Sequence, residues 1–292
     1  MNKIVPHFWY DTEATEAGKF YKSIFPDAAI SDETTLKDTP SGDAPTFTIT
    51  IAGQEFMLLS AGPIFKKNPS ISIRMDFNDK QELEKVWNQL SENGKVLMPL
   101  DSYPHSVLYG WLQDKYDVSW QLMHNEDIST NHRITPTLMF TEEQSGKAEE
   151  AIRFYTDIFK DAKIEQIDKY EEGEDPSNGI KYAGFRLEGQ EFAAMDSGLD
   201  HGFTFNEGIS LIVYCSDQDE IDYYWEKLSA VPEAEQCGWI KDKFGVSWQI
   251  IPAAMKDMMN ANDPKKLEKV TQAFLKMKKF DIKELERAYN EE

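Results

Sequence analysis

Apolar and polar positions alternate along short runs of this chain, and apolar positions return at helical spacing between those runs. In residues 117–122 (DVSWQL), valine, tryptophan and leucine alternate with serine and glutamine, which predicts a strand with two unlike faces. Residues 245–250 (GVSWQI) repeat this pattern. Each run follows a similar stretch, at 109–116 and 237–244, that ends in a turn of charged and small residues. Both runs are therefore predicted to be the second strand of a hairpin.

The two halves of the chain repeat one order of elements. Each half is predicted to contain two β-α-β-β-β modules, with a helix between the first two strands of each module. Asp79 precedes Glu82 by three residues, the spacing of a capping box at a helix start, and Asp217 with Glu220 repeats it. The predicted helices cover residues 17–25 and 83–90 in the first half and 151–159 and 221–228 in the second.

This repetition gives the domain organisation and the fold class. A first domain is expected at 1–125, a polar linker at 126–133, a second domain at 134–252 and a helical tail at 253–292. The fold class is α+β: two tandem domains, each of paired modules that form a curved mixed sheet, plus the C-terminal tail. The tail is expected to pack on the second domain or on a partner subunit.

Composition narrows the range of partners. Of the 292 residues, 40% are hydrophobic, which suits a globular chain, and the formal net charge is −21. Such a charge repels phosphate backbones and anionic lipid, so neither nucleic acid nor a membrane is an expected partner. The first residues lack the long apolar stretch of a signal peptide, and a cytoplasmic protein is expected. Cys215 and Cys237 are expected to be free thiols.

Paired modules of this kind resemble the vicinal oxygen chelate superfamily, which includes glyoxalases, extradiol dioxygenases and bleomycin-resistance proteins. More narrowly, the chain is similar to the PhnB-like branch. The motifs that carry this similarity are Phe20-Tyr21, Gly53-Gln54-Glu55-Phe56, residues 115–121 (KYDVSWQ), Phe154-Tyr155, Met195-Asp196 and residues 242–249 (DKFGVSWQ). Some relatives in this branch carry a demethylubiquinone methyltransferase label. The sequence contains no glycine-rich strand-to-helix turn that would hold a methyl-donor cofactor, and no cofactor is expected.

The resemblance also implies where a divalent metal would bind. Superfamily enzymes hold the ion on the concave sheet face with ligands near the middle of four strands. Carried over, these places fall on Pro6, Leu58, Ser70 and Gln121 in the first half, and on Pro136, Ala194, Gly208 and Gln249 in the second. Such ions need imidazole or carboxylate donors, so neither half is expected to bind a metal. His7 is expected to face the other side of its strand.

The expected concave faces supply the candidate ligand-binding residues. Gln121 and Gln249 could orient a ligand or could be hydrogen-bonded structural residues. Arg74 and Asp196 would be costly lone charges in a cavity unless they are paired or used, so each is either functional or part of an ion pair. The candidates are Phe8, Tyr10, Arg74, Trp111 and Gln121 in the first half and Phe140, Asp196, Tyr214, Trp239 and Gln249 in the second.

Three functions remain open. The first is metal-independent binding of a small aromatic or cationic organic molecule, with no catalytic residue assigned. The second is a metal-dependent lyase, isomerase or dioxygenase, with His7 brought into the site by a different strand register. The third is a non-catalytic interaction module whose clefts are filled by side chains. The chain is expected to be a monomer with pseudo-dimeric tandem domains or a homodimer.

Overall fold

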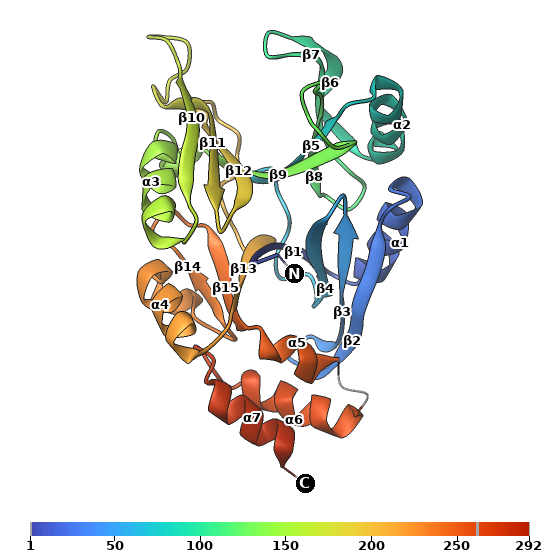
Figure 1. The fold of residues 1–292 in the computed structure, drawn as a ribbon, viewed down its shortest axis with the longest axis vertical. Helices are drawn as coiled ribbons and strands as arrows, with labels where there is room; N and C mark the ends of the chain where they lie inside the picture. The colour runs from blue at the N-terminus through green and yellow to red at the C-terminus, as the bar shows by residue number, and fades with distance from the viewer. Residues whose placement is uncertain (1, 261–262, 292) are drawn as a thin grey trace. The chain divides into compact units, whose positions relative to one another are not determined.

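The computed structural model describes residues 2–260 and 263–291, and within them the chain forms two mixed sheets and a helical C-terminal segment (Figure 1). The α+β fold class is confirmed. The elements of the first half are β1 (Ile4–Tyr10), α1 (Ala14–Ile24), β2 (Ala29–Thr39), β3 (Gly42–Ile51), β4 (Gln54–Ser60), β5 (Ile71–Phe77), α2 (Lys80–Ser91), β6 (Lys95–Tyr103), β7 (Ser106–Gln113) and β8 (Ser119–His124).

The second half repeats this order with one change. Its elements are β9 (His132–Phe140), η1 (Glu142–Gln144), α3 (Ala148–Ile158), β10 (Lys163–Lys169), β11 (Ile180–Leu187), β12 (Gln190–Asp196), β13 (Ile209–Cys215), α4 (Gln218–Leu228), η2 (Pro232–Ala234), β14 (Trp239–Lys241) and β15 (Ser247–Pro252). The fourth module, β13 to β15, has the short 3₁₀ helix η2 where the second module has β6. This missing strand explains why one sheet has seven strands and the other has eight.

The modules pair across the two halves of the sequence. The seven-stranded sheet has the order β14-β15-β13-β1-β4-β3-β2, so it combines the first module with the fourth. The eight-stranded sheet has the order β10-β11-β12-β9-β5-β8-β7-β6 and combines the third module with the second. Strand β1 lies antiparallel to β13, and β5 lies antiparallel to β9. The prediction that each sheet lies within one half of the sequence is wrong, because each sheet takes strands from both halves.

The compact units of the chain follow the sheets. The seven-stranded unit consists of the residues up to Lys19, those from Ala28 to Lys66 and those from Asn206 onward. The eight-stranded unit consists of residues Phe20–Asp27 and Lys67–Phe205. The boundaries at 125 and 134 therefore separate the sequence repeats, not the compact units. Strand β9 already begins at His132, inside the expected linker.

Each of the two Trp-Gln strands, β8 and β15, is held by a buried aspartate at an equivalent position of its hairpin. The indole nitrogen of Trp120 donates to Asp114 at 2.9 Å, and that of Trp248 donates to Asp242 at 2.9 Å. Both tryptophans are fully buried, and Trp120 packs against Phe25, the residue that follows α1. Because side chains alternate along a strand, Gln121 and Gln249 lie on the opposite face.

The capping residues predicted for the second helix of each half are confirmed. Asp79 accepts hydrogen bonds from the first turn of α2, and Asp217 accepts one from the first turn of α4. Such caps satisfy backbone amides that have no partner within the helix. None of the helices in the described part of the chain is long and apolar enough to cross a membrane.

The C-terminal tail forms three helices that belong to the seven-stranded unit. They are α5 (Ala254–Met259), α6 (Pro264–Phe274) and α7 (Ile282–Asn290), and α6 and α7 lie side by side in Figure 1. Asp263 and Asp281 cap α6 and α7. The apolar faces of the three helices share one small core, in which Val270 and Leu285 are fully buried.

Candidate functional site

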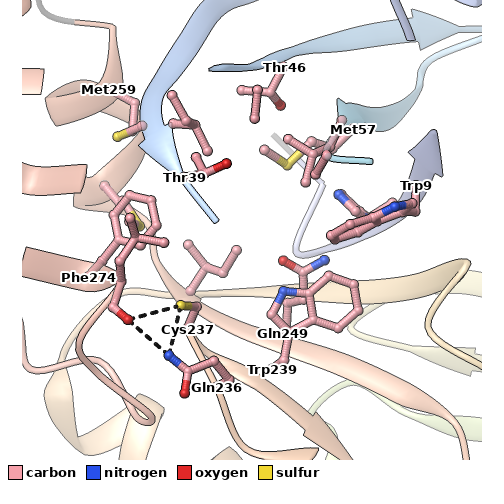
Figure 2. Close-up of a pocket in the computed structure, with 18 of the residues that line it drawn as sticks. Trp9, Thr39, Thr46, Met57, Gln236, Cys237, Trp239, Gln249, Met259 and Phe274 are labelled. Carbon is pink, nitrogen blue, oxygen red and sulfur yellow. Dashed lines mark hydrogen bonds between the residues drawn. The ribbon is translucent and has the colours of Figure 1, made fainter. Parts of the chain in front are cut away.

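A cavity of about 500 Å³ lies in the seven-stranded unit, between the sheet and the tail (Figure 2). This volume falls within the range of small-molecule sites, which are mostly apolar with a few placed polar groups. The cavity lining follows this pattern. It includes His7, Trp9, Thr46, Met57, Leu59, Phe65, Tyr214, Cys237, Trp239, Gln249, Ile251, Met255, Met259, Phe274 and Phe280.

One end of the cavity is aromatic. The rings of Trp9 and Trp239 meet edge to face with centroids 6.2 Å apart, and Phe65 lies parallel to Trp239 at 6.5 Å. The indole nitrogen of Trp9 donates to the carbonyl of Gly62 at 2.7 Å, which fixes the ring. Edge-to-face and offset arrangements are the favoured geometries of aromatic groups, so this end can accept a further ring.

A chain of hydrogen bonds runs beneath the aromatic end. Gln249 donates from Nε2 to Ser210 Oγ at 3.0 Å, and Ser210 Oγ lies 3.3 Å from Nδ1 of His7. All three side chains are buried. The ring of His7 meets Trp239 edge to face at 5.5 Å. The polar groups of this chain of hydrogen bonds are an imidazole, a hydroxyl and an amide.

The other end of the cavity is built by the tail. Figure 2 shows Met259 and Phe274 across the pocket from Trp9, Trp239 and Gln249. The amide of Gln236 donates to the carbonyl of Leu275 at 2.9 Å and holds the loop before β14 against α6. Burial raises the pKa of the Cys237 thiol, which also faces this end. A neutral thiol and flexible thioethers make this wall apolar and adaptable.

Three of the charged residues at the cavity, Asp32, Lys256 and Glu207, are held in ion pairs. Lys256 of α5 contacts Asp32 of β2 at 2.9 Å and Glu55 of β4 at 3.5 Å. Burial alone would raise the pKa of Asp32, but hydrogen bonds from Lys256 and Asn260 hold it below its usual value. Glu207 contacts Lys241 at 2.6 Å. These pairs tie the tail and the loops to the sheet and leave little net charge for a ligand at those places.

Of the five candidate residues that belong to the seven-stranded unit, three line this cavity and two do not. Tyr214, Trp239 and Gln249 are part of its wall. Phe8 and Tyr10 were expected there, but they lie on the opposite face of β1, where Phe8 stacks on Phe56 at 5.5 Å. Six of the seven residues of β1 are buried, so its apolar pattern does not reveal which face is concave.

The concave face of the eight-stranded unit is arranged differently. Gln121 donates to Ser72 at 2.7 Å and accepts from the hydroxyl of Tyr109 at 2.9 Å. Trp111 donates from its indole nitrogen to Ser119 at 2.7 Å. Gln121 and Trp111 are therefore brought together, as neighbours across β7 and β8, but both are engaged by the protein itself.

The charged candidates of this unit have structural partners. Arg74 is buried, lies 3.1 Å from Asp76 and donates to the hydroxyl of Tyr182 at 2.8 Å. Burial disfavours its charge, but Asp76 and Tyr182 raise the pKa of Arg74 above its usual value. Asp196 accepts from the backbone amide of Ala148 at 3.1 Å, at the start of α3. Burial raises the pKa of Asp196.

Phe140, the remaining candidate, packs edge to face on Phe205 at 4.9 Å and is fully buried. Neither Phe140 nor Asp196 faces the concave side that carries Gln121: Asp196 caps a helix, and Phe140 is its register partner on the neighbouring strand. Both expectations are corrected. The predicted assignment of residues to the two faces of β9 and β12 is shifted by one residue.

The strand positions expected for a metal also differ from those on the concave face. In the seven-stranded sheet, this face carries His7 of β1, Met57 of β4, Ser210 of β13 and Gln249 of β15, because Met57 and Ser210 are the register partners of His7 and Gln249 bonds to Ser210. Pro6 and Leu58 point to the other side, and Gly208 and Ser70 precede their strands. Thus His7 faces the cavity, contrary to expectation.

These side chains do not fit a divalent ion. They offer one imidazole, a thioether, a hydroxyl and an amide, whereas such ions require several imidazole, thiolate or carboxylate donors. Within residues 2–260 and 263–291, no three histidine, cysteine, aspartate or glutamate side chains form a group that could hold a metal. In the eight-stranded sheet, Pro136 and Ala194 also lie opposite to Gln121, so only the glutamine positions were placed correctly.

Sequence reasoning missed the aromatic residues Trp9 and Phe65 and every tail residue of the wall. The alternation of His7 and Trp9 was a usable signal, because a histidine followed two residues later by a tryptophan marks one strand face. Nothing in the sequence indicates that Phe274 or Met259 closes a cavity, since their spacing predicts only a helix face.

Comparison with known proteins identifies the family of this chain. The family described as 3-demethylubiquinone-9 3-methyltransferase matches residues 2–123 and again residues 132–251. A solved protein from Bacillus cereus, described as a putative 3-demethylubiquinone-9 3-methyltransferase and PhnB protein, is 33% identical over 42% of this chain and 100% of its own length, with a TM-score of 0.40. A search among curated proteins finds no match.

The fold extends to more distant proteins. Glyoxalase I from Zea mays is 13% identical over 85% of this chain and 93% of its own, with a TM-score of 0.51. At that identity the likeness concerns the fold alone. The two matched repeats together cover most of the chain. The chain therefore belongs to the 3-demethylubiquinone-9 3-methyltransferase family, the PhnB-like branch of the vicinal oxygen chelate fold, and carries two tandem copies of it.

Proposed function

We propose that the cavity of the seven-stranded unit binds a small, largely apolar aromatic molecule and does so without a metal ion. The observation that carries this proposal is the cavity of about 500 Å³ with an aromatic end formed by Trp9 and Trp239. Pockets of this size and lining commonly bury most of the surface of a small organic ligand. No residue of the cavity is assigned a catalytic role.

Metal independence is supported by the donor set on the concave face. His7 is the single imidazole there, and its Nδ1 is engaged by Ser210. Gln249 occupies the place where metal-binding relatives need an anionic donor, and a neutral amide supplies a weak ligand field. A divalent ion at this place would remain poorly coordinated.

An aromatic ligand is better supported than a cationic one. Two of the three acidic residues that line the cavity, Asp32 and Glu207, already pair with Lys256 and Lys241. A cation would have to displace those lysines, whereas a ring only has to displace water from apolar walls. The net charge of −21 also gives no basis for binding nucleic acid.

Tryptophan fluorescence tests the proposal directly, because two indoles line the cavity. We expect 4-ethylanisole, an aromatic probe with no hydrogen-bond donor, to quench the protein's emission in a saturable way. The change should be largely lost in Trp239→Phe, because that indole would touch the probe. Trp111→Phe is the matched control in the other unit, where the indole is bound to Ser119, and it should keep the saturable signal.

Dialysis against EDTA, checked by elemental analysis, should leave the affinity unchanged. The proposal fails if the probe gives no saturable signal. It also fails if binding disappears with EDTA and returns with an added divalent ion.

A further inference from the structure

The two glutamines of the repeated Trp-Gln strands occupy equivalent places but have different partners. Each donates from Nε2 to a serine on the neighbouring parallel strand, Gln121 to Ser72 at 2.7 Å and Gln249 to Ser210 at 3.0 Å. Each also lies opposite a tryptophan of the adjacent antiparallel strand, Trp111 or Trp239. The two sites therefore share a frame, and the difference between them concerns the amide oxygen.

In the eight-stranded unit, a phenol of the chain itself binds that oxygen. The hydroxyl of Tyr109 donates to Oε1 of Gln121 at 2.9 Å. Burial raises the pKa of Tyr109, so the hydroxyl keeps its proton and acts as the donor. Tyr103 and His105 pack edge-on against the Tyr109 ring at 5.6 and 4.8 Å and cover it. The acceptor of Gln121 is thus satisfied internally.

In the seven-stranded unit, no phenol among the described residues is hydrogen-bonded to the oxygen of Gln249. Cys237 stands two residues before Trp239, as Tyr109 stands two residues before Trp111. Its short side chain points to Gln236 and to the carbonyl of Leu275. Within the described chain, the one side-chain hydrogen bond of Gln249 runs through Nε2 to Ser210, while Gln249 also lines the cavity. Its amide oxygen remains an acceptor on the cavity side.

The direction of this amide is fixed by the groups behind it. Nε2 of Gln249 donates to Ser210 Oγ, and Ser210 Oγ in turn lies 3.3 Å from Nδ1 of His7, whose tautomer sets the direction of that second bond. Oε1 must then point the other way. Because Gln249 is buried and its oxygen faces an apolar cavity, a ligand that leaves this acceptor without a donor loses binding energy.

We propose that the ligand of this cavity is a hydroxylated aromatic compound, a phenol, whose hydroxyl donates to Oε1 of Gln249 as Tyr109 donates to Gln121. The inference rests on the proposed function and names its ligand class. The ring would lie at the aromatic end, against Trp9 and Trp239. The side chain at positions 109 and 237 therefore determines whether the glutamine binds the chain or a ligand.

A pair of probes that differ only in the donor tests this. Calorimetric titration of the full chain at neutral pH, where a phenol stays protonated, compares 4-ethylphenol with its methyl ether 4-ethylanisole. We expect the phenol to bind about tenfold more tightly, the effect of one buried hydrogen bond. In Gln249→Ala, the two affinities should come within about twofold of each other.

The other unit offers a gain-of-binding test. Tyr109→Ala removes the internal phenol and leaves Gln121 with an open acceptor beside a ring-sized gap, so 4-ethylphenol should occupy a second site and the stoichiometry should rise from one to two. The double variant with Gln121→Ala should not gain this preference for the phenol over its ether.

The outcomes separate the two proposals. Equal binding of phenol and ether to the unaltered chain, or a preference that survives in Gln249→Ala, overturns the phenol assignment and leaves the proposed function standing. Failure of both probes to bind overturns the proposed function itself. The comparison on the unaltered chain needs no variant to fold.

Discussion

Asp114 accepts four hydrogen bonds in the first of the Trp-Gln hairpins. One of its oxygens accepts from the backbone amides of Tyr116 and Val118, and the other accepts from Tyr21 and Trp120. Burial nevertheless raises the pKa of this carboxyl, because the desolvation of the charge outweighs the four donors. The carboxylate is retained because only an acceptor-only group satisfies four donors at once.

Asp114→Asn should therefore be destabilising even though it removes a buried charge. The amide would turn an NH₂ group toward the indole N–H or toward the two backbone amides, and one donor pair would lose its acceptor. We expect the free energy of unfolding to fall by about 1–3 kcal/mol, measured by chemical denaturation. Asp117→Asn, an exposed change three residues along the same turn, is the matched control and should stay near zero. Equal stability of the two variants would contradict the claim that the four donors require the Asp114 carboxylate.

For single residues, the sequence predicts which side chains are buried better than it predicts the sheet face on which a side chain lies. The buried role of Trp120 and Trp248 follows from their alternation with polar residues. The orientation of His7 does not follow, because β1 has apolar or aromatic residues on both faces and is buried on both. A one-residue shift on such a strand changes every side chain from one face to the other, so His7 and Trp9 replace Phe8 and Tyr10 in the cavity.

Among the elements, the tail depends on a close backbone approach at one glycine. The amides of Cys237 and Gly238 donate to the carbonyls of Met277 and Lys278 at 2.9 and 2.7 Å, which docks the chain before α7 onto the start of β14. Gly238 has a φ of +80°, and a Cβ there would lie 2.6 Å from the ring of Phe280. Only glycine allows both this conformation and this contact.

Gly238→Ala should loosen the tail and open the cavity. The ring of Phe280, which lines the cavity, has to move away from the new methyl group. We expect faster amide hydrogen exchange in residues 277–290 and at least tenfold weaker binding of an aromatic probe. Gly53→Ala is the matched control, because Gly53 has a φ of +79° with nothing near its Cβ position.

In this control variant, only the strain of the left-handed conformation should lower the free energy of unfolding, by about 1 kcal/mol. The tail amides should stay protected from exchange, and the aromatic probe should still bind. Identical exchange in the two variants would show that backbone strain alone acts at Gly238. Element identities were within reach of the sequence, since the caps of α2 and α4 form as predicted. The place where the tail docks was not, because docking depends on shape rather than periodicity.

At the scale of the whole molecule, the pairing of modules was the feature that sequence could not decide. All four modules carry nearly the same apolar pattern, so a first module can pair with the second module of its own half or of the other half. Both arrangements bury the same faces and have the same strand alternation. The observed pairing, β1 with β13 and β5 with β9, depends on contacts between residues about 200 and 60 positions apart in the chain. Local patterns hold no information on that choice.

Because each sheet contains strands from both halves, the two halves should stay associated even when the linker between them is cut. A protease site placed within residues 126–131, before β9 begins, should be cleavable because that segment is mostly exposed. After cleavage the two fragments should co-elute on size exclusion at the mass of the intact chain, because each sheet takes strands from both fragments. Denaturant should separate them, since only hydrogen bonds and packing then join them. Fragments that part under native conditions would mean that each half closes its own sheet.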